Sequence, residues 1–401
     1  MFAIRAAVAF DGERFRDDGA TVLVEGDRLV GVEGAHHEPP ADCSVTTYDG
    51  TLLPGLFDTH VHLVADGTPG GLERAPTLPP QELDEVITAS LHRQAAAGVT
   101  TVRDLGDCGY RTLGHRDPVP GRPRVLSAGP PLTVPDGHCH FLGGAVEGPA
   151  AVEAAVAERA ERQVDVVKVM ASGGLLTPGT DVLGVQFSPD ELALAVREAH
   201  RHGLPLVAHA HSLAGAWAAS DAGVDGIEHV SCLTEEGVRT PEELLVRLAE
   251  QQVVLCPTLG TDPERTPSLE LAPPPLRELA ERLGVTPAEM PRKRAEQMTR
   301  VRAHGIVVVS GSDAGIAPAK DHGGVWRSVL DLLLADYSVA EALASATSVA
   351  ARVCGVGHET GRLAAGLAAD LLVADADLRA DPDALGRPEA VWIRGKQVAG
   401  D

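Results

Sequence analysis

Apolar segments alternate with helix-like segments through most of this chain, and this alternation restricts its fold more than any other feature. Eight apolar segments have the length and the Val, Ile and Leu content of buried strands. Helical stretches such as residues 81–98 and 188–203 separate most of them. Repeated strand–helix units favour parallel strands, and eight units predict a (β/α)8 TIM barrel of the α/β class. The eight predicted strands are residues 51–60, 98–106, 123–129, 164–171, 204–211, 224–230, 253–259 and 305–315.

Both ends of the chain follow a different pattern. Residues 1–52 contain short apolar runs separated by the turn pairs Asp11-Gly12 and Gly26-Asp27, which is typical of antiparallel hairpins. Residues 356–401 repeat this pattern. We therefore predict that the two termini form a small β-sandwich domain beside a barrel of residues 53–355.

One helix start and one connection stand out between the strands. Ser188, Pro189 and Glu191 form a capping pattern, and Gly203 is a stop signal, so a helix is predicted between them. Residues 259–300, after the seventh strand, are long for such a connection. Because loops after barrel strands lie on the catalytic face, this segment is either a lid or a set of surface helices without a catalytic role.

The composition indicates the kind of protein. Its 401 residues carry a formal net charge of −23, which argues against nucleic acid and anionic membranes as partners. No apolar window of about 18 residues is present, so no membrane span is expected. The first residues are interpreted as a strand rather than a signal peptide. The six cysteines show no CxxC pairing, as in proteins with reduced thiols. We predict a cytoplasmic protein.

Two histidines at the end of the first predicted barrel strand indicate a metal site. His60 and His62 are two residues apart, so their side chains share one face of the strand. At the carboxyl end of a barrel strand this face looks into the mouth, where barrel enzymes have their active sites. Imidazole is a common ligand of divalent metals, and two from one strand form part of a coordination sphere.

Other predicted strands end in residues that suit the same site. Lys168 lies in phase with Val164 and Val166, and an ammonium buried among valines is costly unless it is neutralised or paired. The other candidates at strand ends are His209, His211, His229 and Asp313. Each alone has an ordinary structural explanation, such as an ion pair, a core hydrogen bond or a helix cap. Their common position favours one shared site.

These residues lie in motifs that resemble those of the amidohydrolase superfamily. The stretches "DTHVHL", "VKVMASGG", "VAHAHS", "GIEHVS" and "GSDAG" follow the order of its five ligand motifs, and the resemblance covers nearly the whole chain. The stretches "KVMASGG" and "PPLTVPDGHCHFLGG" further resemble the imidazolonepropionase-related branch, which contains bacterial Xaa-Pro dipeptidases (prolidases).

The resemblance implies a centre of two divalent metal ions, with Zn²⁺ as the expected metal. By position, the implied ligands are His60, His62 and Asp313 for the first ion, His209 and His229 for the second, and Lys168 between them. Lys168 would bridge as a carbamate formed with CO₂, since an ammonium has no lone pair to donate. The ions would activate a water and polarise the scissile carbonyl. Asp313 would carry the proton from the water to the leaving amine.

The motif after the fifth strand departs from the family. "HAHSLAG" has no acidic residue shortly after His209, which disfavours deamination and imidazolone hydrolysis, and Lys168 favours the two-metal type. Dipeptidase-like members often have Tyr where this chain has His211. We interpret His211 as a catalytic hydrogen-bond donor to the substrate or transition state, with a metal-ligand role as the alternative.

Substrate contacts are predicted on two loops. The resemblance makes His138 a contact for a substrate carbonyl or carboxylate, and His140 lies on the same Gly-rich loop. His322, after the eighth strand, is a similar candidate. The alternative for each is an exposed loop histidine. Arg103 and Arg111 are further candidates for a carboxylate contact, and nothing in the sequence selects between them.

The predicted function is hydrolysis of an amide bond in a small molecule, first an Xaa-Pro dipeptide or another N-acyl amino acid. The same chemistry serves cyclic amides, lactones, carbamates and arylureas, so these are alternatives. A non-catalytic binding barrel is a remote alternative, because the ligand set is intact. The sequence leaves the exact substrate, the native metal and the oligomeric state open, a homo-oligomer included.

Overall fold

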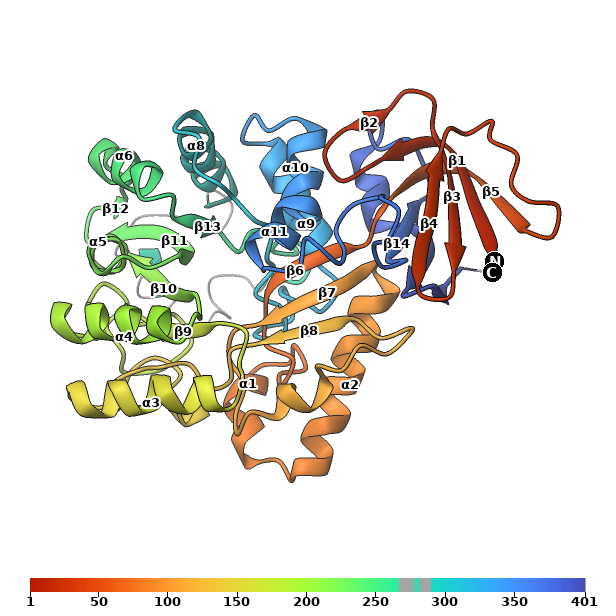
Figure 1. The fold of residues 1–401 in the computed structure, drawn as a ribbon. Helices are drawn as coiled ribbons and strands as arrows, with labels where there is room; N and C mark the ends of the chain where they lie inside the picture. The colour runs from red at the N-terminus through yellow and green to blue at the C-terminus, as the bar shows by residue number, and fades with distance from the viewer. Residues whose placement is uncertain (267–276, 278–279, 282–289, 401) are drawn as a thin grey trace.

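Strands and helices alternate as predicted in the computed structural model, which describes residues 1–266, 277, 280–281 and 290–400 (Figure 1). In the barrel region, β6, β7 and β8 form a parallel three-stranded sheet. A second, five-stranded sheet holds β9, β10, β11 and β13 in parallel, with β12 as an antiparallel edge. These strands are β6(Leu56–Val61), β7(Val99–Asp104), β8(Arg124–Ser127), β9(Val167–Met170), β10(Leu206–Ser212), β11(Gly226–Thr234), β12(Gly237–Val238) and β13(Val254–Cys256).

Single parallel bridges connect the two sheets. The bridged pairs are Leu132 with Val169, Leu255 with Val308, and Val61 with Ala314. The first pair joins the segment after β8 to β9, and the other two join residues 306–314 to β13 and to β6. The contacts therefore follow the order of the predicted strands around the barrel region.

The predicted eighth strand, residues 305–315, is not a regular strand. It pairs through isolated bridges and through hydrogen bonds such as that from the Asp313 amide to the His60 carbonyl, which is 2.8 Å long. Gly305, Asp313 and Gly315 have φ angles of 67°, 61° and 102°, which a continuous strand does not allow. The segment still reaches the end of β6, and this brings Asp313 beside His60.

Helices cover the outer side of these strands (Figure 1). They bury one apolar face each; in α2, for example, Ile87 and Leu91 have no exposed surface. In the part of the chain that the structure describes, no helix is long and apolar enough to cross a membrane. The helices are α1(Gly71–Arg74), α2(Pro80–Ala96), α3(Pro149–Glu161), α4(Pro189–Arg201), α5(Leu213–Ala222), α6(Glu242–Glu250), α8(Met290–Ala303), α9(Val325–Leu333), α10(Val339–Ser345) and α11(Ser348–Val353).

The two chain ends meet in one sheet of eight strands beside the barrel region (Figure 1). Its order is β16-β15-β14-β5-β1-β3-β4, with β2 paired to β1, so the two ends join where β14 pairs with β5. A separate apolar core with Ile4, Val22 and Val373 packs on this sheet. The strands are β1(Phe2–Phe10), β2(Phe15–Arg16), β3(Ala20–Glu25), β4(Arg28–Glu33), β5(Ser44–Pro54), β14(Leu371–Ala374), β15(Pro388–Ile393) and β16(Lys396–Ala399).

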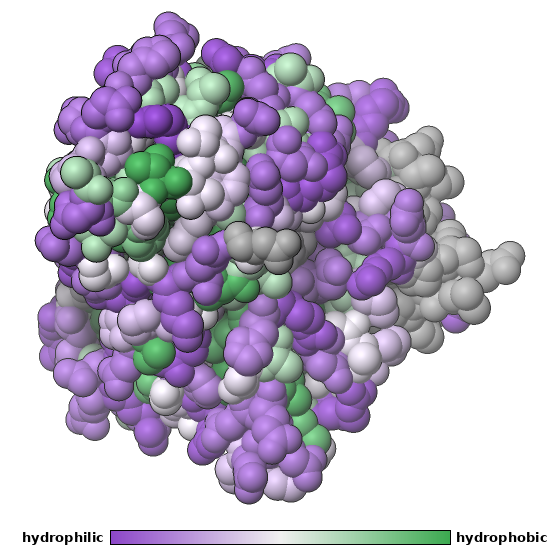
Figure 2. All heavy atoms as spheres, turned by 90° about the vertical axis from the view of Figure 1, so that its right-hand side faces the viewer, coloured by the Kyte–Doolittle hydropathy of each residue, from purple (hydrophilic) through white to green (hydrophobic). Residues whose placement is uncertain are grey.

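The surface and the cysteines agree with the composition. Figure 2 shows hydrophilic residues over most of one face, with apolar residues in small, separate patches. A surface of this kind offers no broad apolar area for a partner on that face. All six cysteines are free, as predicted for reduced thiols.

The long predicted connection 259–300 is described only in part. Its described residues are 259–266, 277, 280–281 and 290–300, and the last of these belong to α8. The rest lies outside the described residues, so the choice between a lid and surface helices stays a prediction.

The helix predicted to begin at Ser188 is α4, and the predicted capping contacts are confirmed. The Ser188 hydroxyl accepts a hydrogen bond of 3.3 Å from the Glu191 amide, and the Glu191 carboxylate accepts one of 3.1 Å from the Ser188 amide. Gly203 follows the helix with a φ of 71°. Because α4 precedes β10, its position helps to place His209 and His211.

Removing the Ser188 hydroxyl should destabilise the fold by about 1 kcal/mol, because the Glu191 amide loses its acceptor. We expect Ser188→Ala to lower the Tm in thermal unfolding. Ser188→Asp, which restores an acceptor, should keep most of the stability. A Ser188→Ala protein with the wild-type Tm would show that the cap contributes nothing here.

Candidate metal centre and active site

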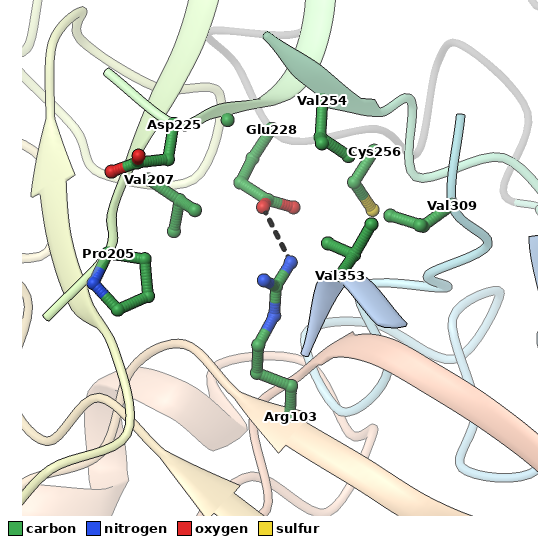
Figure 3. A pocket seen from close by; sticks show the side chains of 10 residues that line it. Arg103, Pro205, Val207, Asp225, Glu228, Val254, Cys256, Val309 and Val353 are labelled. Atoms are coloured by element: carbon green, nitrogen blue, oxygen red, sulfur yellow. Dashed lines mark hydrogen bonds and ion pairs between the residues drawn. The ribbon is translucent and has the colours of Figure 1, made fainter. Parts of the chain in front are cut away.

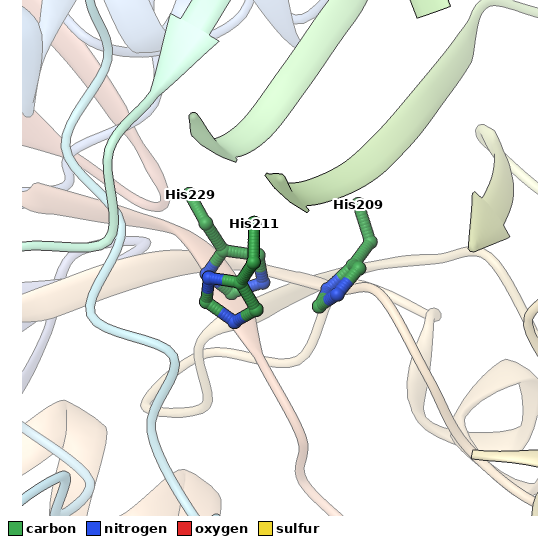
Figure 4. A group of neighbouring side chains, drawn as sticks. All are labelled: His209, His211 and His229. Carbon is green, nitrogen blue, oxygen red and sulfur yellow. The ribbon is translucent and has the colours of Figure 1, made fainter. Parts of the chain in front are cut away.

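Five histidine side chains carried by β6, by the residue that follows it, by β10 and by β11 converge. The ring centroid of His60 lies 5.4 Å from that of His62 and 5.1 Å from that of His229. The His209 centroid lies 4.7 Å from that of His211 and 4.6 Å from that of His229. Figure 4 shows the side chains of His209, His211 and His229 turned toward one another. These five residues, named here the histidine cluster, come together as the strand ends predicted.

Asp313 faces His60, which lies in β6, and His62, which directly follows this strand. Its Oδ1 atom lies 3.4 Å from Nε2 of His60 and 3.2 Å from Nε2 of His62. The backbone at Asp313 is left-handed, with a φ of 61°, a conformation that is uncommon outside glycine and that clusters at functional sites. Burial alone would raise the pKa of Asp313, but the imidazoles of His60 and His62 hold it well below its usual range.

The second nitrogen of each of these imidazoles is held by the protein. Nδ1 of His62 lies 3.0 Å from the Gly106 carbonyl, and Nδ1 of His60 lies 2.7 Å from the Glu228 carboxylate. Since carbonyl and carboxylate oxygens accept, both Nδ1 atoms donate, so each imidazole in its neutral form has its lone pair on Nε2, which faces Asp313. Lone pairs this close to a carboxylate need a positive charge between them, either a proton or a metal cation.

The histidines of β10 and β11 are held in a similar way. Nε2 of His209 donates to the Gly173 carbonyl at 3.2 Å, so its Nδ1 keeps a lone pair. Nδ1 of His229 lies 2.8 Å from the Thr258 hydroxyl. Ligand atoms of His209, His211 and His229 lie within 4.8 Å of one another. This spacing fits a bound cation, because a small ion can reach all three.

The protonation of His60 and His211 also fits metal binding. Ligand atoms of His60, His229 and Asp313 form a second group within 4.8 Å. Burial lowers the pKa of His60 and of His211 to about 4, so both imidazoles are neutral near pH 7. Neutral imidazole and ionised carboxylate are the forms of these groups that bind divalent cations.

Lys168 is buried beside the histidine cluster. It lies on β9, pairs in register with Val207 of β10 and is 1% exposed. Burial lowers its pKa, and its charge is near enough to lower the pKa of His209 and His229. Among the described residues, its ammonium has no hydrogen-bond or ion-pair partner. A buried ammonium without a partner is costly, and a carbamate between two cations would relieve that cost.

Comparison with known proteins identifies the family. Residues 51–398 match the family model described as "Amidohydrolase family". The chain belongs to this family. Its relatives include an uncharacterized protein of Mycobacterium tuberculosis, 30% identical over 91% of this chain and 90% of its own length. Ochratoxinase of Aspergillus niger is 30% identical over 56% of this chain and 53% of its own. The structure of an Xaa-Pro dipeptidase has the same fold, with a TM-score of 0.85, 23% identity and 99% coverage of each chain.

Family membership confirms the resemblance inferred from the motifs. Imidazolonepropionases and prolidases are among the matches, in agreement with the suspected branch. The chain is therefore a metal-dependent amidohydrolase. The remote alternative of a non-catalytic binding barrel is not supported.

Two predicted substrate contacts lie at the histidine cluster of the amidohydrolase. The His138 centroid is 4.6 Å from that of His209, and Nδ1 of His138 lies 2.8 Å from the Thr177 hydroxyl. His211 stacks on His229 with 4.4 Å between centroids, and its Nδ1 lies 3.0 Å from the Ser231 hydroxyl. Both rings are therefore in reach of a molecule bound at the cluster.

The other two predicted contacts bond to protein groups. Nδ1 of His140 donates to the Gly137 carbonyl of its own loop at 2.9 Å. Nε2 of His322 donates to the Ala65 carbonyl at 2.8 Å, and its Nδ1 lies 3.4 Å from the Gln94 amide nitrogen. With both nitrogens engaged, His322 supports the loop after β6.

Both arginines considered for a substrate carboxylate already pair with a carboxylate of the protein. Arg111 pairs with Asp84, with its Nε atom 3.1 Å from the carboxylate. Arg103 is 6% exposed and donates to the Glu228 carboxylate at 3.0 Å. Burial alone would raise the pKa of Glu228, but Arg103 and His60 lower it to about 2. Arg103 therefore serves an internal ion pair.

Sequence reasoning missed two buried charged residues next to the cluster. Arg294 of α8 donates to the carbonyls of His229 at 2.6 Å, Val230 at 3.2 Å and Pro257 at 2.8 Å. His229 and Val230 have φ angles of 67° and 45°, so the guanidinium holds a strained segment in β11. No sequence signal marks Arg294. Glu228 was detectable, because it is a carboxylate in an apolar strand directly before His229.

The lack of a side chain at Gly174 leaves space for the His138 ring. A larger residue at position 174 should therefore displace this ring. A Cβ atom at this position would lie 2.2 Å from Cε1 of His138. We expect Gly174→Ala to break the contact between His138 and Thr177 in a crystal structure. A displacement of about 1 Å should lower kcat/KM by about 100-fold. Gly114→Ala, whose Cβ meets nothing within 4 Å, is the control, and an unmoved His138 would contradict the prediction.

Proposed function

We propose that this amidohydrolase cleaves an amide bond of a small molecule at a binuclear metal centre, with an Xaa-Pro dipeptide or another N-acyl amino acid as first candidate. The observation that carries the proposal is the meeting of five imidazoles, the Asp313 carboxylate and the unpartnered Lys168 amine at neighbouring strand ends. The likeness in fold to an Xaa-Pro dipeptidase supports the first candidate.

Six residues would hold the two cations, for which we propose Zn²⁺. They are His60, His62 and Asp313 for the first, His209 and His229 for the second, and Lys168 as a carbamate bridge. The lone pairs that face Asp313 support the first position. The lowered pKa of buried Lys168 supports the bridge, because the neutral amine is the form that reacts with CO₂. An unmodified ammonium would repel the cations.

The bound cations would supply Lewis-acid activation of a water and of the scissile carbonyl. Asp313 would accept a proton from the attacking water on its carboxylate and deliver it to the leaving nitrogen. His211 and His138 would donate hydrogen bonds to the substrate carbonyl or carboxylate. Burial lowers the pKa of His138 to about 3, so it would orient the substrate as a neutral donor.

We also propose that the barrel region is a closed (β/α)8 barrel of residues 53–355, with sandwich parts at residues 1–52 and 356–401. The bridges between the two sheets support closure, with residues 306–314 in the place of the eighth strand. The shared terminal sheet supports the grouping of the two ends. A cytoplasmic location completes the proposal.

A second candidate is hydrolysis of a non-peptide substrate, such as a cyclic amide, a lactone, a carbamate or an arylurea. The sequence similarity to ochratoxinase, 30% identity over 56% of this chain, supports it. The same centre would serve both candidates. The two candidates differ in the part of the substrate farthest from the scissile bond, so the protein groups that bind this part determine which substrate is cleaved.

Metal analysis and a substrate panel test the proposal. Protein prepared with Zn²⁺ and bicarbonate should contain about two metal ions per chain. The panel would hold Xaa-Pro dipeptides, N-acyl amino acids, cyclic amides, lactones, carbamates and arylureas. Fastest turnover of the first two classes supports the first candidate, and fastest turnover of another class supports the second. Less than one tightly bound metal ion, with no hydrolysis in the panel, would overturn both.

Lys168→Ala should lose the bridge between the cations. We expect the affinity for metal to fall by about 100-fold or more, since even outer partners of metal ligands contribute about 10–100-fold. Turnover should fall with it, and added short-chain carboxylic acids should restore part of both. Lys396→Ala, on an exposed strand of the terminal sheet, is the control. Full rate and metal content in Lys168→Ala would disprove the carbamate.

Asp313→Asn should keep much of the metal and lose most of the turnover. An amide retains an oxygen ligand but cannot take up the proton, so kcat should fall by about 10²–10⁴-fold. Metal content by mass spectrometry and kcat for the best substrate of the panel measure the two effects separately. Unchanged turnover would remove Asp313 from the role of proton shuttle.

A further inference from the structure

A series of buried polar contacts runs behind the histidine cluster, from Arg103 on β7 through Glu228 on β11 to His60 on β6. Oε2 of Glu228 lies 2.7 Å from Nδ1 of His60, and Oε1 of Glu228 lies 3.0 Å from Nη2 of Arg103. Figure 3 shows the guanidinium pointing at this carboxylate. Glu228 and His60 are each 1% exposed. Each carboxylate oxygen thus has its own protein partner.

These contacts are tied to the strand that carries His60. Nε of Arg103 donates to the carbonyl of Thr59 at 2.8 Å, and Thr59 is the residue directly before His60. Glu228 forms an ion pair with the adjacent guanidinium, and the oxygens of an ion-paired carboxylate accept hydrogen bonds. His60 therefore donates from Nδ1. This leaves the lone pair of His60 on Nε2, which lies 3.4 Å from Asp313.

A metal position on the Glu228 side of His60 is disfavoured. Ligand atoms of His60, Glu228 and Cys256 do lie within 4.8 Å of one another. However, the Arg103 guanidinium already binds this carboxylate and would repel a cation placed there. The Cys256 sulfur lies 3.6 Å from the Thr59 hydroxyl. The contacts favour Glu228 as an acceptor for His60 rather than as a metal ligand.

A cavity of about 100 Å³ borders Arg103 and Glu228 (Figure 3). Its lining includes Pro205, Asp225 and Val254, which lie directly before or at the first residues of β10, β11 and β13. The cavity is thus at the amino ends of the strands, whereas the histidine cluster is at their carboxyl ends. Its volume is about three times the share of one water molecule in the liquid, which is enough for formate.

We propose that Glu228, anchored by Arg103, is a positioning residue that fixes the His60 imidazole with its proton on Nδ1 and its Nε2 lone pair toward the first metal position. This inference rests on the proposed function, since it gives His60 the role of a metal ligand. Carboxylates that hold a metal-binding histidine in this way contribute about 10–100-fold to metal affinity.

The Zn²⁺ affinity of the metal-free protein, measured by competition with a chromophoric chelator, tests the inference. Glu228→Ala should bind Zn²⁺ about 10–100-fold more weakly than the wild type. Because the removed side chain would join its volume to the cavity, added formate should recover much of the affinity. In Glu228→Gln the volume stays filled, so the affinity should fall without recovery by formate. Val353→Ala enlarges the same cavity without altering the carboxylate and should bind like the wild type.

Histidine protonation gives a second readout that does not depend on any variant. NMR of the metal-free wild type labelled with ¹⁵N-histidine should show His60 protonated at Nδ1. If Glu228→Ala does not fold, this spectrum and the affinity of Glu228→Gln decide the question.

The outcomes separate this inference from the proposed function. Wild-type Zn²⁺ affinity in Glu228→Ala and Glu228→Gln, or a wild-type His60 protonated at Nε2, would overturn the positioning role and leave the proposed function standing. A wild-type protein that binds no Zn²⁺ would overturn the proposed function, and this inference with it.

Discussion

The cost of burying polar groups away from water governs the arrangement of this molecule. His60, His62 and Asp313 bring two lone pairs and a carboxylate within 3.4 Å, where almost no solvent reaches them. Such a group is stable only if positive charge balances it. The ring nitrogens that face away from the centre have protein acceptors, so the protein orients the imidazoles and the proposed cations supply the balancing charge. Family membership agrees with a balancing charge supplied by bound cations, because amidohydrolases are metal-dependent.

Each strained segment that carries a candidate ligand is held by a buried group of the charge it requires. Near Asp313, the carboxylate of Asp58 accepts a hydrogen bond of 2.9 Å from the Ser312 amide. Burial raises the pKa of Asp58 to about 6, although its hydrogen bonds oppose the shift. Near His229, the Arg294 guanidinium takes the backbone carbonyls instead. A carboxylate therefore binds a buried backbone amide next to Asp313, and a guanidinium binds buried backbone carbonyls at His229 and Val230.

Strand periodicity was sufficient to predict most of the strands and the candidate ligands. Side chains such as His60 and His209 follow apolar runs, and the carboxyl ends of parallel strands meet at one edge of the sheet. Their convergence could therefore be predicted from the sequence, without knowing which residues are in contact. The prediction of a regular eighth strand was wrong because Gly305, Asp313 and Gly315 take positive φ angles. The residues that hold these candidate ligands in place could not be predicted from the sequence, for a different reason. Arg103 and Glu228 are 125 residues apart, and no local pattern records that they touch.

The junction of the two chain ends has a consequence for how the protein is made. Leu371 and Leu372 of β14 pair with Pro54 and Leu53 of β5, directly before the strand that bears His60. During translation, that early strand leaves the ribosome long before β14 exists. The nascent chain therefore carries an open sheet edge through almost the whole of synthesis, and the base of the first histidine strand is locked only when the last segments emerge.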